Sequence, residues 1–296
     1  MTVRVPAKVN VQLAVGAARP DGFHGLANVF LAVSLFDEVT ATPAQALTVT
    51  CAGPDADQVP LDRTNLAARA AEILAARAGI EPAVHLHIAK NIPVAGGMAG
   101  GSADGAAALL ACDALWGLDT PRAELLDICA VLGSDVPFSL VGGAALGTGR
   151  GELLTPVDAG TFHWVFAVAD GGLSTPAVFR EFDRLTAGTA VPEPEASPAL
   201  LAALASGDPD ALAATLANDL QPAALSLRPA LADTLAAGTG AGALAALVSG
   251  SGPTTAFLVR DEESAAKVAA ALYAAGACRA THVASSPAPG ATVLPS

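Results

Sequence analysis

The feature that most constrains this chain is a glycine-rich run, Pro-Val-Ala-Gly-Gly-Met-Ala-Gly-Gly-Ser-Ala, over residues 93–103. It lies between a strand-like segment and a helix-like one, Ser102 to Trp116. Its four glycines permit positive φ and a close approach to a ligand, so successive N–H groups can converge on anionic oxygens. The helix adds free N-terminal amides and its positive dipole end. The run predicts a phosphate-binding loop, with a plain strand-to-helix turn as the alternative.

Two common phosphate motifs do not describe this run. Gly96 and Gly101 have the spacing of G-x-x-x-x-G-K-[ST], but Ser102 stands where the lysine belongs. The dinucleotide fingerprint G-x-G-x-x-G would require glycine at the position of Ala95. The rest of the chain therefore has to identify the ligand.

Length and charge limit the possible partners. A chain of 296 residues can form one large domain or two domains of ordinary size without stabilisation by a disulfide or a bound metal ion. Its formal net charge is −13, from 15 Lys+Arg against 28 Asp+Glu. This balance argues against a nucleic-acid backbone or an anionic membrane surface as partner. An anionic small molecule must then be held by local dipoles and a few placed cations.

The cysteines and the apolar segments favour a soluble cytoplasmic protein. Cys51, Cys112, Cys129 and Cys278 are scattered without a C-x-x-C motif, so we expect reduced thiols. The uncharged stretch 234–259 is long enough to span a membrane, but its glycines and proline favour a loop. The first motif begins at residue 5, which leaves no room for a signal peptide.

Strand and helix signals alternate along the chain and predict a mixed α and β fold. Apolar periodicity predicts a helix over 64–79 and a strand over 83–89. A helix over 121–133 and a polar turn over 132–138 follow, and a new strand over 163–169 begins a second unit, with a boundary near residue 155. Helices are expected over 198–206 and 208–218, a glycine turn over 249–253, a strand over 255–259 and a loose tail from 285.

His85 and His87 form an i, i+2 pair on the predicted strand over 83–89. Such a pair can chelate a metal ion, but no third ligand is evident. We therefore expect two imidazoles on a solvated strand face.

Separated segments together resemble the GHMP kinases over nearly the whole length. Within that family the pattern is most similar to the enzymes that phosphorylate 4-diphosphocytidyl-2-C-methyl-D-erythritol in the non-mevalonate (MEP/DXP) isoprenoid pathway. The segments are Pro6-Ala-Lys-Val-Asn10, Arg19-Pro-Asp-Gly-Phe-His24, the loop 93–103, Leu132-Gly-Ser-Asp-Val-Pro137 and Ser249-Gly-Ser-Gly252. Their order and spacing make the combination specific, although each alone is weak.

This resemblance implies an α+β fold of two lobes with the active site between them. The N-terminal lobe, residues 1–155, is expected to resemble ribosomal protein S5 domain 2 and to carry the phosphate loop. The C-terminal lobe, residues 156–285, is expected to be ferredoxin-like, and 286–296 to be a tail. The implied reaction is transfer of phosphate from ATP, with Mg²⁺, to the 2-hydroxyl of the substrate.

The resemblance also assigns two catalytic residues. Asp135 matches the family's base, which accepts the proton of the attacking hydroxyl. Lys8 matches the cation that pairs with it and stabilises developing negative charge. Taken alone, a lysine at a strand end is usually solvated, and an aspartate after Gly-Ser is often a turn or cap residue.

Substrate contacts are implied at five further positions. Phe23 matches an aromatic residue on which cytosine stacks, and His24 one that hydrogen-bonds its edge. The family often has tyrosine at position 23, so this chain keeps the stacking face and lacks a hydroxyl. Asn10 matches the residue that holds the methylerythritol hydroxyls, and Thr175 and Phe179 the far side of the cytidine pocket. Core packing is the alternative for the two phenylalanines.

ATP is implied at the glycine-rich loop and at the start of the first helix. Asn65 matches an adenine-site position, although helix capping explains it equally well. The family frequently has glycine at positions 95 and 99, where methyl groups are tolerable if φ is negative, and serine at 103. Ser102 is therefore the candidate contact to phosphate or Mg²⁺, and Asp104 is a metal candidate by proximity alone. The predicted ATP contacts are Asn65, Pro93, Val94, Ala95, Gly96, Gly97, Met98, Ala99, Gly100, Gly101, Ser102 and Ala103.

Three alternative functions would require different sequence features. A GHMP kinase acting on homoserine, mevalonate or a sugar would keep the loop but lack Asp-Gly-Phe-His at 21–24, which is present. A non-catalytic sensor of the same fold would be expected to lose Lys8 or Asp135, and both remain. A nicotinamide-dependent dehydrogenase would need the missing dinucleotide fingerprint.

Overall fold

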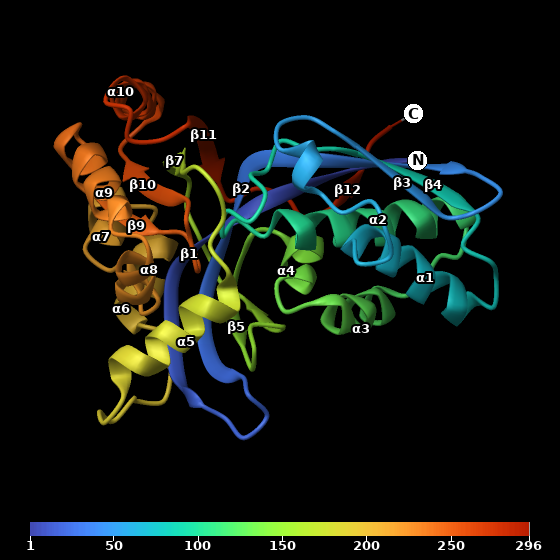
Figure 1. The fold of residues 1–296 in the computed structure, drawn as a ribbon, viewed down its shortest axis with the longest axis horizontal. Coiled ribbons are helices and arrows are strands. Elements are labelled where there is room, and N and C mark those ends of the chain that lie inside the picture. Colours follow the sequence, from blue (N-terminus) through green and yellow to red (C-terminus); the bar gives the residue numbers. More distant parts are fainter. Residues whose placement is uncertain (296) are drawn as a thin grey trace.

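The computed structural model describes residues 1–295 and contains two β-sheets (Figure 1). The first sheet has the strand order β12-β1-β2-β4-β3, with β5 paired to β2, β6 to β5 and β8 to β1. The second has the order β11-β7-β10-β9. The strands are β1 (Thr2–Ala18), β2 (His24–Pro43), β3 (Thr48–Ala52), β4 (Val84–Ala89), β5 (Ala144–Thr148), β6 (Leu153–Pro156), β7 (Phe162–Val168), β8 (Ala217–Asn218), β9 (Ala245–Val248), β10 (Thr255–Val259), β11 (Ala280–Ser286) and β12 (Thr292–Val293).

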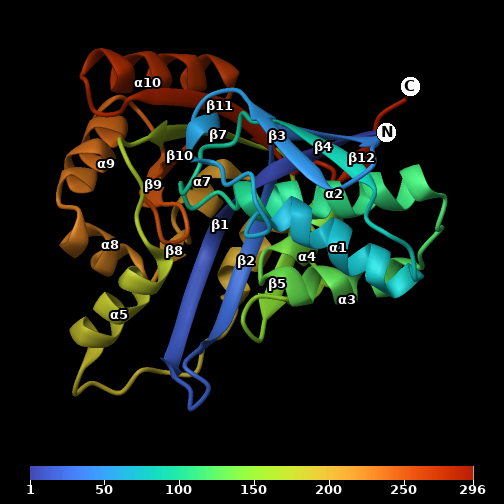
Figure 2. The ribbon, with the colours of Figure 1, turned by 45° about the vertical axis from the view of Figure 1, so that its right-hand side comes forward.

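Ten α-helices and one short 3-10 helix accompany the strands in the described part of the chain. Helices α1–α4 lie together on one side of the first sheet, whereas α6–α10 surround the second (Figures 1 and 2). The helices are η1 (Ala56–Gln58), α1 (Leu66–Ala78), α2 (Gly100–Trp116), α3 (Arg122–Leu132), α4 (Val136–Val141), α5 (Thr175–Thr186), α6 (Pro198–Ser206), α7 (Pro209–Ala213), α8 (Gln221–Leu227), α9 (Ala230–Gly240) and α10 (Glu262–Ala274).

The long β1–β2 hairpin joins the two halves of the molecule. Its strands span 17 and 20 residues, and most of β1 is buried because helices and other strands cover it. Near one end β1 pairs with β12, and farther along it pairs with β8. Figure 2 shows the hairpin with α5 on one side and the α1–α4 layer on the other. Residues at its turn can therefore face elements from both halves.

Local signals account for the helices and strands that the sequence predicts in the first half. The helix expected over 64–79 is α1, which begins where Asn65 accepts the Ala67 N–H and ends at Gly79 with φ of 68°. The strand expected over 83–89 is β4, with alternating burial as a period of two requires. The helix α2 is buried along most of its length, and its alanines let neighbouring elements approach closely.

The second sheet has the expected ferredoxin-like order, since its strands in sequence number 4-1-3-2 across the sheet. Alternate residues of these strands pack into two different hydrophobic cores, one on each face of the sheet. Trp164, Phe166 and Leu258 join the main core, which also contains α1–α3. Val165 and Phe257 point to the opposite face, where they pack with residues of α10. The second sheet is therefore packed on both faces, and one of its two cores is shared with the first half.

Three expectations about the second half are wrong in detail. The stretch 234–259 is not a loop: it contains most of α9, then β9 and β10. The helix expected over 208–218 ends early, because α7 stops at Ala213 and residues 217–218 form β8. Residues 286–295 are not a loose tail. The Ala288 N–H donates to Ala32 O at 2.9 Å and the Leu294 N–H to Thr2 O at 2.8 Å, so backbone pairing ties this segment to the hairpin.

Thiols and imidazoles outside the cavity have ordinary surroundings. All four cysteines are free, and burial raises the pKa of Cys112 and of Cys129 to about 12. On the β3–β4 face, a ring nitrogen of His85 lies 2.9 Å from the Thr48 hydroxyl, and one of His87 lies 2.9 Å from that of Thr50. Within residues 1–295, no group of three or more His, Cys, Asp or Glu is arranged to hold a metal ion. None of the helices described there combines the length and apolar character needed to cross a membrane.

Candidate active site

A cavity of about 890 Å³ lies where the β1–β2 hairpin, the glycine-rich loop, α5 and the 249–252 turn meet. It gathers residues that are far apart in the sequence, including both proposed catalytic residues and all five proposed substrate contacts. Seven residues of the glycine-rich loop also line it. The predicted site residues found there are Lys8, Asn10, Phe23, His24, Ala95, Gly96, Gly97, Ala99, Gly100, Gly101, Ser102, Asp135, Thr175 and Phe179.

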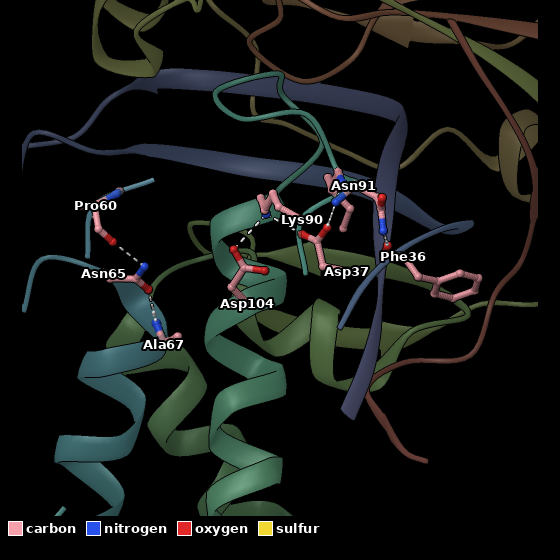
Figure 3. A network of polar contacts seen from close by, with 9 residues as sticks. Phe36, Asp37, Pro60, Asn65, Ala67, Lys90, Asn91 and Asp104 are labelled. Carbon is pink, nitrogen blue, oxygen red and sulfur yellow. Dashed lines mark hydrogen bonds and ion pairs between the residues drawn. The ribbon is translucent and has the colours of Figure 1, made fainter. Parts of the chain in front are cut away.

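The remaining predicted residues lie around the cavity rather than on its wall. Met98 and Ala103 are fully buried in the main core, where they anchor the loop. Pro93 and Val94 are the first two residues of the glycine-rich loop. The Asn65 side chain caps α1 and donates to Pro60 O at 2.7 Å, while its neighbour Leu66 lines the cavity. Both polar groups of the Asn65 amide are thus used inside the protein (Figure 3).

The 249–252 turn holds the glycine-rich loop in place. The Ser249 hydroxyl donates to Gly97 O at 3.2 Å, and the Thr254 N–H donates to Gly96 O at 3.3 Å. From the other side, the Lys8 N–H donates to Met98 O at 3.3 Å. A Cβ added at Gly97 would lie 2.1 Å from Ser249 O, so the close approach requires glycine. These contacts fix the loop while the free amides of the α2 N-terminus remain at the cavity.

The backbone at Ala95 and Ala99 differs from what the sequence suggested. Methyl groups there are tolerable at negative φ, but the φ values are +52° and +60°. Ala99 stands immediately before α2 in the left-handed conformation. This conformation costs an L-residue about 1–2 kcal/mol. The fold of the loop therefore requires backbone geometry that glycine adopts more readily than alanine.

We expect Ala99→Gly to stabilise the protein by about 0.5–1 kcal/mol, because relief of the left-handed strain exceeds the added flexibility of the unfolded chain. Urea unfolding followed by circular dichroism measures this difference. The matched control is Ala103→Gly inside α2, which should destabilise by about 1 kcal/mol or more. Equal destabilisation by both substitutions would contradict this expectation.

The proposed catalytic residues lie together at one end of the cavity. The Lys8 Nζ is 3.6 Å from Asp135 Oδ2 and donates to Asn10 Oδ1 at 2.6 Å. The Asn10 amide donates in turn to Asn28 Oδ1 at 2.6 Å. Lys8, Asn10 and Asn28 are buried. This chain of contacts holds the ammonium group beside the carboxylate at a fixed position.

Asp135 keeps its carboxylate available to a ligand. It occupies the position before α4, but its side chain makes no capping hydrogen bond. The side chain is 32% exposed, and the residue lines the cavity. Capping, the ordinary explanation for an aspartate here, therefore does not account for this residue. A substrate hydroxyl placed at this end could donate its proton to the carboxylate.

Aromatic rings form the other end of the cavity. His24 stacks on Phe179 with ring centroids 5.0 Å apart, and its Nδ1 lies 2.9 Å from Gly16 O. A carbonyl oxygen accepts only, so Nδ1 carries the proton and Nε2 of the neutral ring is an acceptor. Nε2 lies 3.5 Å from Asp183 Oδ1. Phe23 is 49% exposed, which leaves its ring accessible for stacking.

Several cavity residues were not predicted from the sequence. Asn28 reaches Asn10 through the pairing of β1 with β2, and no local pattern signals this. Asp183 and Arg150 come from α5 and from the turn between β5 and β6. The 249–252 motif did signal a turn, and Ser251 there contacts Thr175, with 2.8 Å between the hydroxyl oxygens.

A buried ionic cluster formed by Lys90, Asp37 and Asp104 lies next to the glycine-rich loop (Figure 3). Lys90 Nζ donates to Asp37 and, at 2.8 Å, to Asp104 Oδ2, and all three side chains are buried. Asp37 Oδ1 also accepts the N–H groups of Asn91 and Ile92 at 2.6 and 2.8 Å. The cluster thus ties β2 and the residues just before the loop to the N-terminal half of α2.

The buried position of Asp104 excludes it as a metal ligand in the cavity, which corrects the suggestion made from proximity. Burial raises the pKa of Asp104 to about 7, against the opposing effect of Lys90. Burial also disfavours the charged form of Lys90, but the two carboxylates outweigh it and raise the pKa of that lysine. The Ser102 hydroxyl belongs to a residue that does line the cavity.

Comparisons with known proteins agree with this geometry. The profile of the GHMP kinases N terminal domain matches residues 65–143, and that of the GHMP kinases C terminal domain matches residues 200–278. The 4-diphosphocytidyl-2-C-methyl-D-erythritol kinase of Streptomyces avermitilis is 76% identical over 295 residues, which cover 99% of each chain. That of Thermobifida fusca is 59% identical over 303 residues, covering 99% of this chain and 98% of the relative.

A solved structure shows the same likeness in three dimensions. The crystal structure of a 4-(cytidine 5'-diphospho)-2C-methyl-D-erythritol kinase matches with a TM-score of 0.79 at 31% identity, covering 97% of this chain and 100% of that one. Fold, sequence and cavity residues point the same way. The chain belongs to the GHMP kinase family and, within it, to the 4-diphosphocytidyl-2-C-methyl-D-erythritol kinases.

Proposed function

We propose that this chain transfers the γ-phosphoryl group of ATP to the 2-hydroxyl of 4-diphosphocytidyl-2-C-methyl-D-erythritol, a step toward isoprenoid precursors. The proposal rests on one arrangement: a buried lysine and a carboxylate 3.6 Å apart lie in the same cavity as an exposed aromatic ring and a histidine. One end suits the activation of a hydroxyl, and the other suits the stacking of a pyrimidine. The names of the close relatives support the same substrate.

The catalytic step uses Asp135 as the base. The 2-hydroxyl gives its proton to the Asp135 carboxylate while its oxygen bonds to the γ-phosphorus. The bond from that phosphorus to the β–γ bridging oxygen breaks, and ADP leaves with the electron pair. Lys8 stabilises the negative charge that develops on the attacking oxygen and the transferring group. Asn10 orients Lys8 through its 2.6 Å contact and can hydrogen-bond the substrate's remaining hydroxyls.

The glycine-rich loop and the start of α2 are proposed to hold the ATP phosphates. Their backbone N–H groups suit anionic oxygens, since a helix N-terminus has unpaired donors and a positive dipole end. Mg²⁺ neutralises phosphate charge in such transfers. A hard cation of this kind needs few protein ligands beside the phosphates, and the Ser102 hydroxyl on the cavity wall fits that requirement.

At the aromatic end, Phe23 is proposed to stack on cytosine and His24 to read its edge. Phe179 and Thr175 close the far side. His24 is already held by Gly16 O and by its stacking on Phe179, so its ring has a fixed orientation, and Nε2, an acceptor in the neutral ring, lies beside the Asp183 carboxylate. The exocyclic amino group of cytosine is a donor that suits such an acceptor.

The organisation of the chain completes the proposal. We propose an N-terminal domain over 1–155, a C-terminal domain over 156–285 and a terminal segment over 286–296, in which Thr292–Val293 pair with β1 of the first sheet. The partners are ATP and the cytidine-diphosphate-linked substrate, with no nucleic acid or membrane, and the expected compartment is the cytoplasm. The net charge of −13 supports small-molecule rather than polyanionic partners.

An assay of ADP release with Mg-ATP tests the substrate directly. We expect turnover with cytidine-diphospho-methylerythritol, and none above background with homoserine, mevalonate or galactose. The physical reason is that the aromatic end of the cavity offers a nucleobase binding energy that the smaller alcohols cannot use. Turnover confined to one of those three alcohols would overturn the proposed substrate and favour another GHMP kinase activity.

A further inference from the structure

Residues 287–294 follow the last strand of the second sheet and return to the first half of the molecule. Ser286 still pairs with β7, whereas Thr292–Val293 pair with β1. None of residues 287–294 lines the cavity, and the catalytic step uses none of them. Their contacts nevertheless reach both elements that carry the catalytic pair, which are β1 with Lys8 and α4 with Asp135 just before it.

The segment 287–294 holds the C-terminal end of α4. The Ala291 N–H donates to Ser139 O at 3.0 Å, and the Gly143 N–H donates to Ala288 O at 2.8 Å. Ser139 is one turn from Asp135 and donates its own N–H to Asp135 O at 3.1 Å. A helix of six residues has little stability of its own. The position of α4, and of the Asp135 backbone with it, is therefore set by the elements that contact this helix.

Ala288 packs in a small hydrophobic cluster that lies next to the catalytic pair. It is buried there with Phe30 and Phe138, whose rings stack with their centroids 4.8 Å apart. Phe138 is in the first turn of α4, three residues after Asp135. The Lys8 Nζ lies 5.8 Å from the centroid of the Phe30 ring, within the range of a cation–π contact. One ring thus belongs to the helix that follows the carboxylate, and the other lies beside the ammonium group.

The segment also contacts the β1–β2 hairpin at the level of Lys8. The Ala288 N–H donates to Ala32 O at 2.9 Å, and Ala32 is the partner of Lys8 in the β1–β2 register. Farther along, Thr292–Val293 pair with the start of β1. The segment therefore bridges the two backbones whose spacing sets the 3.6 Å separation of Lys8 Nζ and Asp135 Oδ2.

Gly290 packs against the end of α4 without space for a side chain. A Cβ added there would lie 2.4 Å from Leu140 O and 2.5 Å from the carbonyl carbon of Val141. A Cβ added at Gly142 would in turn lie 2.0 Å from Gly290 N. Backbone atoms cannot rotate away as the end of a side chain can. A methyl group at position 290 must therefore displace either the segment or the end of α4.

We propose that Ala288 and Gly290 are positioning residues for phosphoryl transfer, which act by holding Asp135 at its distance from Lys8. The inference rests on the proposed function, because it takes this pair as the reacting groups. The rate of an oriented reaction depends steeply on geometry, and a displacement of about 1 Å can cost about 100-fold. None of the residues proposed to bind cytosine or the ATP phosphates belongs to the cluster around Ala288, so the segment should affect turnover and not binding.

Gly290→Ala in the full chain tests this role. We expect kcat for ADP release to fall by about tenfold to 100-fold, while KM for each substrate stays within about threefold of normal. Cytidine, measured by calorimetry, should bind within about twofold of its normal affinity. The matched control is Gly240→Ala, because both glycines lack a positive φ and a Cβ at position 240 would meet no atom within 4 Å. The control variant should keep normal turnover.

Combination with Asp135→Asn distinguishes positioning from a general loss of structure. Because Gly290 is proposed to act through Asp135, Gly290→Ala should lower kcat by less than about twofold once that carboxylate has been removed. A smaller folded fraction would instead lower kcat by the same factor in both backgrounds.

Two results would overturn the proposal. One is a kcat lowered by less than about threefold in folded Gly290→Ala, and the other is an equal fold loss of kcat in the two backgrounds. If Gly290→Ala does not fold, Ala288→Gly decides the question, because it adds no atom to the contact. A kcat lowered at least about threefold at normal KM would then support the role, and an unchanged kcat would overturn it.

Failure of the proposed function would give a different result. The unmodified chain would then release no ADP with its nucleotide substrate, or Asp135→Asn would turn over normally. Failure of the positioning role alone leaves the unmodified chain active and Asp135→Asn impaired, with Gly290→Ala as active as Gly240→Ala.

Discussion

Replacing Asp135 with asparagine should lower kcat by at least about two orders of magnitude, because the amide cannot accept the substrate's proton. Lys8→Met should cause a comparable loss, because the developing charge then lacks its cation. The 3.6 Å separation of the two side chains and the absence of a capping bond from Asp135 motivate both substitutions. Steady-state ADP release with saturating nucleotides measures the effect.

A control distinguishes loss of chemistry from loss of structure. Asp127→Asn, on an exposed position of α3, makes the same chemical change away from the cavity and should keep normal turnover. The Asp135 and Lys8 variants should still bind cytidine, since the aromatic end is untouched. A near-normal kcat in either variant would contradict the proposed role of that residue in the reaction.

The second large effect is expected at Lys90. Lys90→Met should reduce the free energy of unfolding by about 3–5 kcal/mol, because it leaves two buried carboxylates without a cation. Asp37 and Asp104 are both buried against this ammonium group in Figure 3. Denaturant unfolding measures the loss. The matched control is Lys267→Met, at an exposed position of α10, which should change stability by less than about 0.5 kcal/mol.

The same substitution should also disturb the phosphate loop. The cluster holds the loop entry through the Asn91 and Ile92 N–H groups, and a Cβ added at Gly100 would lie 2.8 Å from Lys90 Nζ. Residues at both ends of the glycine-rich loop thus lie next to the ionic cluster. If the folded Lys90→Met variant retained both its stability and its KM for ATP, the proposed role of the cluster would be wrong.

Asp104 gives the cluster a pH dependence of defined sign. Its pKa is raised to about 7 in the folded protein, mainly by burial, above the ordinary value of 3.8. The folded state therefore holds this proton more tightly than the unfolded state does. The resulting stabilisation is fully present below pH 3.8 and is lost as pH rises through about 7.

Asp104→Asn isolates this contribution. The stability difference, unmodified chain minus variant, should fall as the pH rises from 4 to 8. Urea unfolding at several pH values measures it, and subtracting the variant cancels the titration of the other carboxylates. A difference that is constant or rises over this range would contradict the raised pKa.

Much of the site could be predicted from local sequence because its motifs carry their own geometry. Glycines at 96, 97, 100 and 101 indicated a loop that precedes a helix, and this is where α2 begins. Asn65 and Gly79 carry the signals that begin and end α1. The resemblance carried by four segments and a late glycine turn added the family, the second lobe and the catalytic pair. These signals all act over a short range, because each depends on a few neighbouring residues.

Other features depend on contacts between distant segments and escaped prediction. The positive φ at Ala95 and Ala99 follows from how the 249–252 turn and β1 hold the loop, and no property of alanine suggests it. Residues 285–296 were expected to form a loose tail because chain ends are usually poorly ordered, but Thr292–Val293 pair with the edge of β1. Asp104 follows Ser102 closely in sequence, yet the helix turns its carboxylate toward Lys90 instead of the cavity.

The sequence by itself determined which chemical groups this protein has for its site: a glycine-rich loop before a helix, a lysine, an aspartate, a phenylalanine and a histidine. Tertiary structure decided which groups meet. It paired Lys8 with Asp135 across more than a hundred residues, brought Asn28 to Asn10 and placed Arg150 on the cavity wall. The physical reason is that residue types and local spacing set which interactions are possible, whereas strand register and core packing set the distances at which they act.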